Sequence, residues 1–343
     1  MPSPVLSHRE MNKRRTLLAA AAVQAFLVPL AAIAQQAAPA RKIRRIGFLA
    51  LRARPPSWNN DYYGSFLRRL AELGHVEDEN VVFDWRFADG KAERLPELAK
   101  GLVQGAPDVI VTSGTGATRA VQRETTTIPI VMAVAADPAT SGFITNLARP
   151  ERNVTGVARA AVEVSPHYLE LLMAVAPKLE RAAVLLNPDN EFYSPRLKAI
   201  LKVARAANVR VQRVEARTAG EIESGFKVMS GDGAQAVIVP FDPIYMQYRR
   251  ELAVGALGNR LPSVFGVREH VTAGGLMSYG QDFNQLYRRA ASYVDRILRG
   301  AKPSELPVAQ PSKFELVINL KTAKALGLEI PETLRKSATR LVG

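Results

Sequence analysis

The chain has 343 residues, of which 47% are hydrophobic and 23% charged, a balance typical of a globular protein with room for two domains. It contains no cysteine, which excludes disulfides, thiolate zinc sites, iron–sulfur clusters and a cysteine nucleophile. The formal net charge is +14, but Lys and Arg are scattered in runs of no more than three. We therefore interpret the charge as a solvated surface and expect no nucleic-acid partner.

Residues 1–34 have the layout of a cleavable signal peptide. A basic patch at residues 13–15 precedes an apolar stretch that ends in Ala-Ile-Ala at residues 32–34, a small-x-small cleavage pattern. Met11 is an alternative start, and residues 35–43 read as a flexible linker. The cleavage pattern argues against the alternative of a transmembrane anchor. We expect a periplasmic protein, exported by the Sec or the twin-arginine route.

The mature part alternates short apolar runs with segments of helical periodicity. Strands are expected at residues 46–50, 81–87, 108–113 and 128–134, and helices at 62–73, at 94–104 and from 116. About 130 residues later the pattern repeats, with strands at 181–186, 209–217, 234–242 and 261–267 and helices at 197–207, 219–229 and 245–257. The sequence thus predicts an α/β fold of two Rossmann-like, three-layer domains with parallel sheets and a cleft between them.

The stretch VTSGTGATRAVQ, residues 111–122, places small residues between the third expected strand and a helix. Free amides at a helix N-terminus, with the hydroxyls of Ser113 and Thr115 beside Gly114, suit a carboxylate or another polar oxygen. Alternatively, the hydroxyls cap the helix. A dinucleotide site is poorly supported, because the loop follows the third strand and Arg119 replaces the third glycine.

Other chemistry is weakly supported by the sequence. The four histidines show no metal-binding spacing, and no Walker loop or G-x-S-x-G elbow occurs; Ser278 in LMSYG lacks the first glycine. We expect no metal, no cofactor, no catalytic residue and no enzymatic activity.

Polar and aromatic residues follow several expected strands. Carboxylates and amides in these loops bind a ligand ammonium or cap a helix, and aromatic rings stack on a flat ligand or pack in the ordinary way. Because the carboxyl ends of parallel strands share one edge, we expect these residues at the cleft. The candidates are Trp58, Asp137, Asn187, Phe241, Asp242 and Tyr279.

Two long motifs resemble a known family. DPATSGFITNLARPERNVTGV, residues 137–157, and the segment from GGLMSYG to KALGL, residues 274–328, are similar to the tryptophan/tyrosine-type substrate-binding proteins of ABC transporters. The resemblance implies a type I periplasmic-binding-protein fold, with an N-terminal lobe of residues 44–156 plus 271–304 and a C-terminal lobe of 157–270 plus 305–343. It implies a ligand site on Ser113, Gly114, Thr115, Asp137, Asn187, Phe241, Asp242 and Tyr279.

We therefore expect an exported, monomeric solute-binding protein. It captures a small organic ligand, such as an amino acid or an aromatic or carboxylate compound, between two lobes that close by hinge bending, and delivers it to an inner-membrane ABC permease. An extracytoplasmic sensor domain that passes its ligand to a signalling receptor has the same fold and ligand chemistry. A nucleotide-dependent, dehydrogenase-like enzyme is a further alternative.

Overall fold

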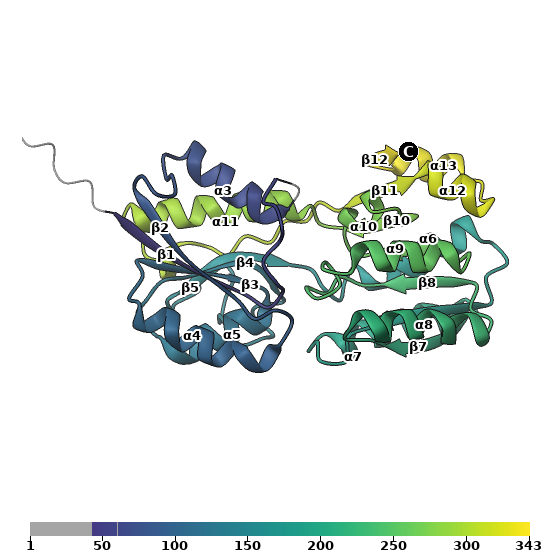
Figure 1. The fold of residues 1–343 in the computed structure, drawn as a ribbon, viewed down its shortest axis with the longest axis horizontal. Coiled ribbons are helices and arrows are strands. Elements are labelled where there is room, and N and C mark those ends of the chain that lie inside the picture. The colour runs from purple at the N-terminus through teal and green to yellow at the C-terminus, as the bar shows by residue number, and fades with distance from the viewer. Residues whose placement is uncertain (1–42, 60) are drawn as a thin grey trace, which may run out of the picture. The chain divides into compact units, whose positions relative to one another are not determined.

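A computed structural model describes residues 43–59 and 61–343 of the chain. Residues 44–343 form one compact unit, and the expected signal peptide and nearly all of the expected linker lie outside the described residues. Figure 1 shows two sheets with helices against both faces of each. None of the helices in residues 43–59 and 61–343 is long and apolar enough to cross a membrane.

The first sheet has five parallel strands in the order β2-β1-β3-β4-β5. Its strands and their helices are β1 (Arg44–Ala50), α3 (Tyr62–Glu72), β2 (Val81–Phe87), η1 (Ala92–Arg94), α4 (Leu95–Gln104), β3 (Val109–Ser113), α5 (Thr115–Glu124), β4 (Ile130–Ala136), β5 (Val154–Arg159) and, later in the chain, α11 (Phe283–Leu298) and η2 (Pro303–Glu305).

The second sheet has seven strands in the order β12-β11-β10-β9-β8-β6-β7, and β11 runs antiparallel to β10. Its elements are α6 (Ser165–Val175), β6 (Arg181–Leu186), α7 (Tyr193–Ala206), β7 (Arg210–Glu215), α8 (Ala219–Gly231), β8 (Ala236–Val239), α9 (Arg249–Gly258), β9 (Ser263–Phe265), α10 (Arg268–Thr272), β10 (Met277–Gly280), β11 (Glu315–Asn319), α12 (Leu320–Leu326), α13 (Glu332–Ser337) and β12 (Arg340–Val342).

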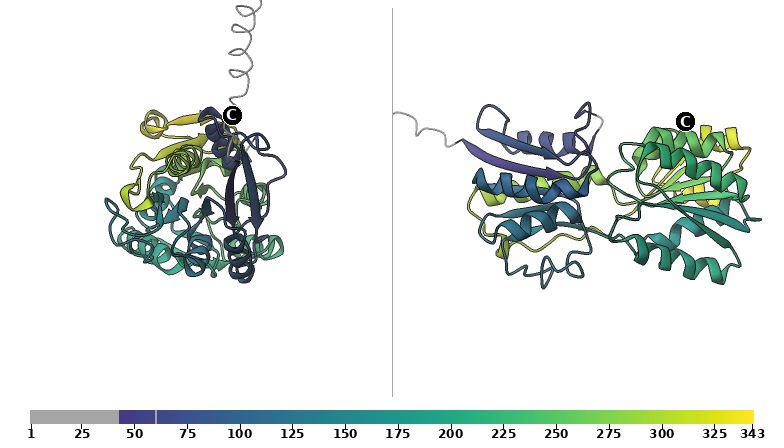
Figure 2. Two further views of the ribbon diagram at one scale, coloured as in Figure 1. Left: turned by 90° about the vertical axis from the view of Figure 1, so that its left-hand side faces the viewer. Right: turned by 60° about the horizontal axis from the view of Figure 1, so that its bottom comes forward.

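Alternation along the buried strands divides each core into two layers. In β1, Ile46 and Phe48 face the cluster that contains residues of α3 and α11, whereas Leu49 faces the cluster built from α4 and α5. In β6, Val184 faces α6 and α7, and Leu185 faces α8 and α9. Side chains of a strand alternate between faces, so apolar residues on both faces require helices on both sides. Figure 2 shows this arrangement from two further directions.

The α/β fold agrees with the sequence prediction, and the sheets are parallel as predicted except at the antiparallel β10–β11 pair. Strand pairing contradicts the expected lobe boundaries. β5 stays paired with β4 as far as Arg159, so the chain leaves the first sheet after Arg159 rather than at Gly156. The segment at residues 277–280, expected as a loop of the N-terminal lobe, is strand β10 of the second sheet. The return to the first sheet therefore begins at α11. It extends beyond Ser304, because Ala309 still bridges Val157.

Candidate functional site

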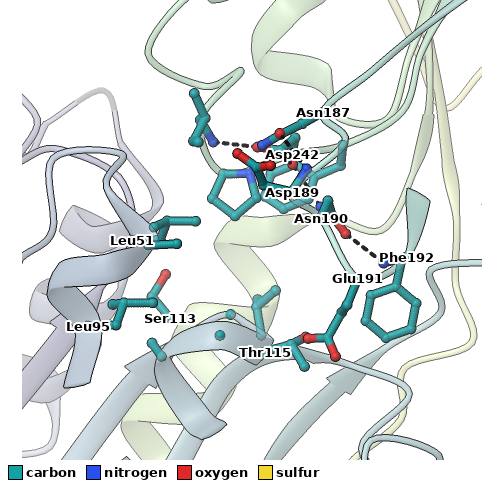
Figure 3. A pocket seen from close by; sticks show the side chains of 18 of the residues that line it. Leu51, Leu95, Ser113, Thr115, Asn187, Asp189, Asn190, Glu191, Phe192 and Asp242 are labelled. Atoms are coloured by element: carbon teal, nitrogen blue, oxygen red, sulfur yellow. Dashed lines mark hydrogen bonds between the residues drawn. The ribbon is translucent and has the colours of Figure 1, made fainter. Parts of the chain in front are cut away.

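A cavity of about 250 Å³ lies where the carboxyl ends of strands from both sheets meet (Figure 3). In open parallel sheets, ligands bind at this edge. The first sheet contributes Leu51, Gly90, Ala92, Leu95, Ser113, Gly114, Thr115, Gly116, Ala117, Arg119, Val134 and Arg159. The loops of the second sheet contribute Asn187, Asp189, Asn190, Glu191, Phe192, Phe241, Asp242, Pro243 and Ile244.

Helix α5 begins at the cavity wall without a side-chain cap. Gly114 is its N-cap, with φ 98° and ψ 166°, a conformation in the region that favours glycine. The first intrahelical bond runs from Thr118 N to Gly114 O, at 3.1 Å. Amides in the first turn of a helix have no carbonyl partner within the helix, and the helix dipole places partial positive charge there. The wall formed by Thr115 and Gly116 is therefore suited to an anion.

The two hydroxyls beside this helix start make tertiary bonds instead of capping the helix. Ser113 Oγ lies 3.0 Å from the Tyr63 hydroxyl and 2.6 Å from the Tyr287 hydroxyl. Thr115 Oγ1 accepts a hydrogen bond from Ala136 N at 3.2 Å. Burial raises the pKa of the Tyr287 hydroxyl well above its usual range, so it stays protonated. These bonds fix the loop to α3, α11 and β4, and leave the helix amides as the polar groups of this wall.

The opposite wall is organised around Asp242, which is only 3% exposed. Its Oδ2 accepts hydrogen bonds from Asn190 Nδ2 at 2.7 Å and from Asn187 Nδ2 at 3.3 Å, and its Oδ1 accepts one from Ile244 N at 2.8 Å. Figure 3 shows Asn187, Asn190 and Asp242 gathered on the side of the cavity away from Ser113 and Thr115. Because three donors converge on this carboxylate, it holds the two loops of the wall together.

Two further carboxylates at the cavity are also paired. Asp189 forms an ion pair with Arg217 at 3.2 Å, within the second sheet's loops. Glu191 pairs with Arg119 of α5 at 2.7 Å, so this ion pair joins elements of the two sheets. Both pairs are partly exposed to solvent, where an ion pair contributes little to stability.

Arg159 places a buried cation at the cavity. It ends strand β5, is 8% exposed, and its guanidinium carbon lies 4.9 Å from the centre of the Phe241 ring. Within the part of the chain that the structure describes, its guanidinium makes no hydrogen bond and no ion pair. Burial, and secondarily the charge of nearby Arg196, lower the pKa of Arg159 to about 9.

Arg196 of α7 lies behind this wall and is 2% exposed. Its Nη1 donates a hydrogen bond to the Phe241 carbonyl oxygen at 2.8 Å, while its Nη2 has no partner among the described residues. Burial lowers the pKa of Arg196 as well. Arg159 and Arg196 therefore place two buried cations beside the cavity, and the negative charges of Asp137 and Asp242 act on both of them.

Six of the nine predicted site residues line this one cavity: Ser113, Gly114, Thr115, Asn187, Phe241 and Asp242. Asp137 is half-buried just beyond β4 and is not part of the lining. Burial raises the pKa of its carboxyl, and the charge of Arg159 opposes that change.

The structure places two predicted aromatic residues elsewhere. Trp58 packs against Trp85, with ring centres 5.0 Å apart, as part of the first sheet's core, which is the ordinary packing that we considered as an alternative. Tyr279 lies in β10 and stacks on Phe314 at 5.7 Å, beside a second cavity of about 450 Å³.

The sequence analysis missed Arg159, Arg119, Glu191 and Phe192 as parts of the lining. For Arg159 a signal was present, since it is the charged last residue of an apolar strand in a parallel sheet. No sequence signal indicates that its guanidinium lacks a partner. Within the described residues, no group of three or more His, Asp or Glu side chains is arranged to hold a metal ion.

Comparison with known proteins identifies relatives over nearly all of the described chain. A tyrosine-binding protein from Clostridioides difficile is 24% identical over 265 residues, which cover 77% of this chain and 76% of that protein. A crystal structure of a conserved domain protein from Vibrio cholerae is 25% identical, with a TM-score of 0.79, and covers 88% of this chain and 100% of that one.

An ABC domain from Streptococcus pneumonia, solved in complex with L-Trp, is 26% identical with a TM-score of 0.77 and covers 87% of this chain and 99% of that one. The family model for ABC transporter substrate binding protein matches residues 56–342. The chain therefore belongs to the ABC transporter substrate-binding protein family, whose members act outside the cytoplasm and capture a solute for an ABC permease.

Proposed function

We propose that this protein captures a small organic ligand, an amino acid or an aromatic or carboxylate compound, in the cavity between the two sheets. The observation that carries the proposal is the meeting of polar loops from both sheets around one cavity. The helix start at Thr115 and Gly116 forms one wall, and Asn187 and Asp242 form the other. The relatives that are named for binding tyrosine and L-Trp support this class of ligand.

The mechanism is closure of two lobes on the ligand. The first lobe comprises residues 44–159 plus 283–309, and the second comprises most of the remainder. A ligand that contacts both walls binds the closed state more tightly than the open one, and so shifts the population toward closure. Within the protein, the Arg119–Glu191 ion pair likewise joins elements of the two sheets.

The protein acts as a monomer in the periplasm, after removal of residues 1–34, and catalyses no reaction. The cavity weighs against a nucleotide-dependent enzyme. Its volume of about 250 Å³ lies below the ~300–1,000 Å³ of pockets for drug-sized ligands, and a dinucleotide is larger still.

The test is thermal unfolding of the purified protein, refolded to remove bound ligand, across amino acids, organic acids, purines and sugars. A ligand that binds only the folded state stabilises it by mass action, by about 2.7 kcal/mol at a ligand concentration a hundred times Kd, and so raises the melting temperature. We expect a rise of several degrees with one chemical class.

A matched pair of variants ties the effect to the cavity. Gly116 and Gly220 are each the second residue of a helix, but Gly116 lines the cavity and Gly220 has open space around it. We expect Gly116→Gln to abolish the rise by filling the cavity, and Gly220→Gln to retain it. Equal loss in both variants, or loss in neither, would contradict the assignment of the cavity.

A further inference from the structure

Two positive groups of independent origin line the same cavity. One is the uncapped N-terminus of the ten-residue helix α5, and the other is the guanidinium of Arg159 at the end of β5. They belong to different elements of the first sheet, and among the described residues no carboxylate of that sheet lines the cavity with them. Such a pair of groups provides directed N–H donors and net positive charge for one anion.

The lack of a hydrogen bond or ion pair to the Arg159 guanidinium among the described residues is the central observation. A buried cation normally has an anionic partner, because removing a charge from water without one is costly. Arg159 is more than nine-tenths buried, yet within the described residues it has an aromatic neighbour, Phe241, and no bonded partner. Arg196 adds a second buried cation nearby. The missing partner is therefore expected to be an anionic group of the ligand.

Among the described residues, each of the three carboxylates that line the cavity already has a partner in the protein. Asp189 is paired with Arg217, and Glu191 with Arg119. Asp242 accepts three hydrogen bonds from its own loops. An ammonium group placed in this cavity would be removed from water beside Arg159, and the remaining carboxylate near Arg159, that of Asp137, lies outside the lining and already faces the Arg159 charge.

We propose that the ligand is an organic carboxylate without an α-ammonium group, held by the Arg159 guanidinium and the first amides of α5. This inference rests on the proposed function. It narrows the ligand class, because it excludes amino acids and keeps carboxylic acids. Leu51, Val134 and Phe241 supply apolar surface in the same cavity for the remainder of the molecule. Arg159 is thus a specificity-determining residue that favours acids over their amino-acid counterparts.

The experiment uses pairs of compounds that differ only in the ammonium group. The pairs are 3-phenylpropionate and L-phenylalanine, indole-3-propionate and L-tryptophan, 3-(4-hydroxyphenyl)propionate and L-tyrosine, and 4-methylpentanoate and L-leucine. Affinities for the refolded protein are measured by calorimetry at pH 7, alongside the thermal screen that includes sugars and purines. We expect the acid of at least one pair to bind at least about ten-fold more tightly than its amino acid.

Two variants locate the effect. Arg159→Met should weaken acid binding by at least about thirty-fold, because a buried charge pair is broken. Its melting temperature without ligand shows whether it folds. Asp137→Asn removes a negative charge near Arg159, and should tighten acid binding rather than weaken it.

The outcomes separate this inference from the proposed function. Tighter binding of an amino acid that is lost in Asp137→Asn would place an ammonium site there and overturn the inference, while the proposed function stands. Binding confined to a sugar or a purine would also overturn the inference, while capture of a small organic ligand in the cavity stands. If no compound of any class binds the folded protein, both fail. Acid binding that is unchanged in Arg159→Met would also overturn the inference.

Discussion

Replacing Arg159 by an uncharged residue should make the ligand-free protein more stable. Its guanidinium is buried at the cavity with no bonded partner among the described residues, and Arg196 lies close enough to repel it. Arg159→Met keeps much of the apolar stem, which can pack against Phe241, and removes the charge. Most substitutions at buried positions destabilise a protein, so a gain here would be diagnostic.

The magnitude follows from the pKa. Burial and the charge of Arg196 lower the pKa of Arg159 from 12.5 to about 9. At about 1.4 kcal/mol per pH unit, the difference corresponds to roughly 5 kcal/mol against the charged form in the folded state. Water in the cavity and relaxation of the site reduce this penalty, so we expect a gain of about 1–3 kcal/mol. For a unit of this size, that gain raises the melting temperature by about 2–6 °C.

The assay is thermal and chemical unfolding of the refolded, ligand-free protein at pH 7. Because the folded pKa is lowered, the penalty is fully present below about pH 9 and declines as the pH rises through that value. At pH 7 the whole penalty for burying the Arg159 charge therefore contributes to the measured stability. Arg159→Lys keeps the charge and should show no gain. A fall of more than about 2 °C in Arg159→Met would refute the reasoning, since it would mean that the guanidinium stabilises the fold.

Three further predictions concern the stability of the ligand-free protein. Burial lowers the pKa of His270 from its ordinary value of 6.5 to about 4, so the unfolded state takes up a proton first and folding stability falls as the pH falls from 6.5 toward 4. In denaturant titrations between pH 7 and 4.5, we expect the wild type to lose ~2–3 kcal/mol more of its free energy of unfolding than His270→Phe. Equal losses would contradict this. A Cβ on Gly255 would lie 2.4 Å from the buried Phe226 ring. Gly255→Ala should therefore lower the free energy of unfolding by about 1–3 kcal/mol, and with it the melting temperature, although alanine has the better helix propensity. An unchanged melting temperature would show that the Phe226 ring moves aside without cost. Glu191→Gln breaks the exposed pair with Arg119 and should cost less than about 1 kcal/mol, and a larger loss would mean that the pair is a principal contact between the sheets.

Sequence periodicity predicted eight of the first nine strands, because most of them are short and largely apolar. β5 was not predicted as a strand. Runs such as residues 108–113 and 181–186 are buried on both faces, and a strand in that position needs apolar residues throughout. β10 was missed, because Met277–Gly280 is only four residues long and has Gly274 and Gly275 just before it, a composition that predicts a loop. The expected helix at 245–257 begins later, at Arg249, since Ile244 to Tyr248 form turns.

The loops of the site were predictable to the extent that topology determines them. Ser113 ends β3 of the first sheet, and Asn187 and Asp242 come after β6 and β8 of the second, so each lies at the carboxyl edge of its own sheet. Which side chains are already bonded depends on contacts between segments far apart in the chain. Asp242 is satisfied by Asn187 and Asn190, 55 and 52 residues away. Without those contacts, a free carboxylate and a bonded one look the same in a sequence.

Arg159 links ligand chemistry to closure through its place in the chain. It is the last residue of β5, where the chain passes from the first sheet to the second, and its guanidinium faces Phe241 from a loop of the second sheet. With no anion, bringing the second sheet's loops over Arg159 buries an unpaired charge, which disfavours closure. With a carboxylate bound, the same movement buries a neutralised pair. A ligand shifts a conformational equilibrium only through its differential affinity for the two states. The unpaired guanidinium supplies that difference, because it penalises the closed state most when the cavity holds no anion.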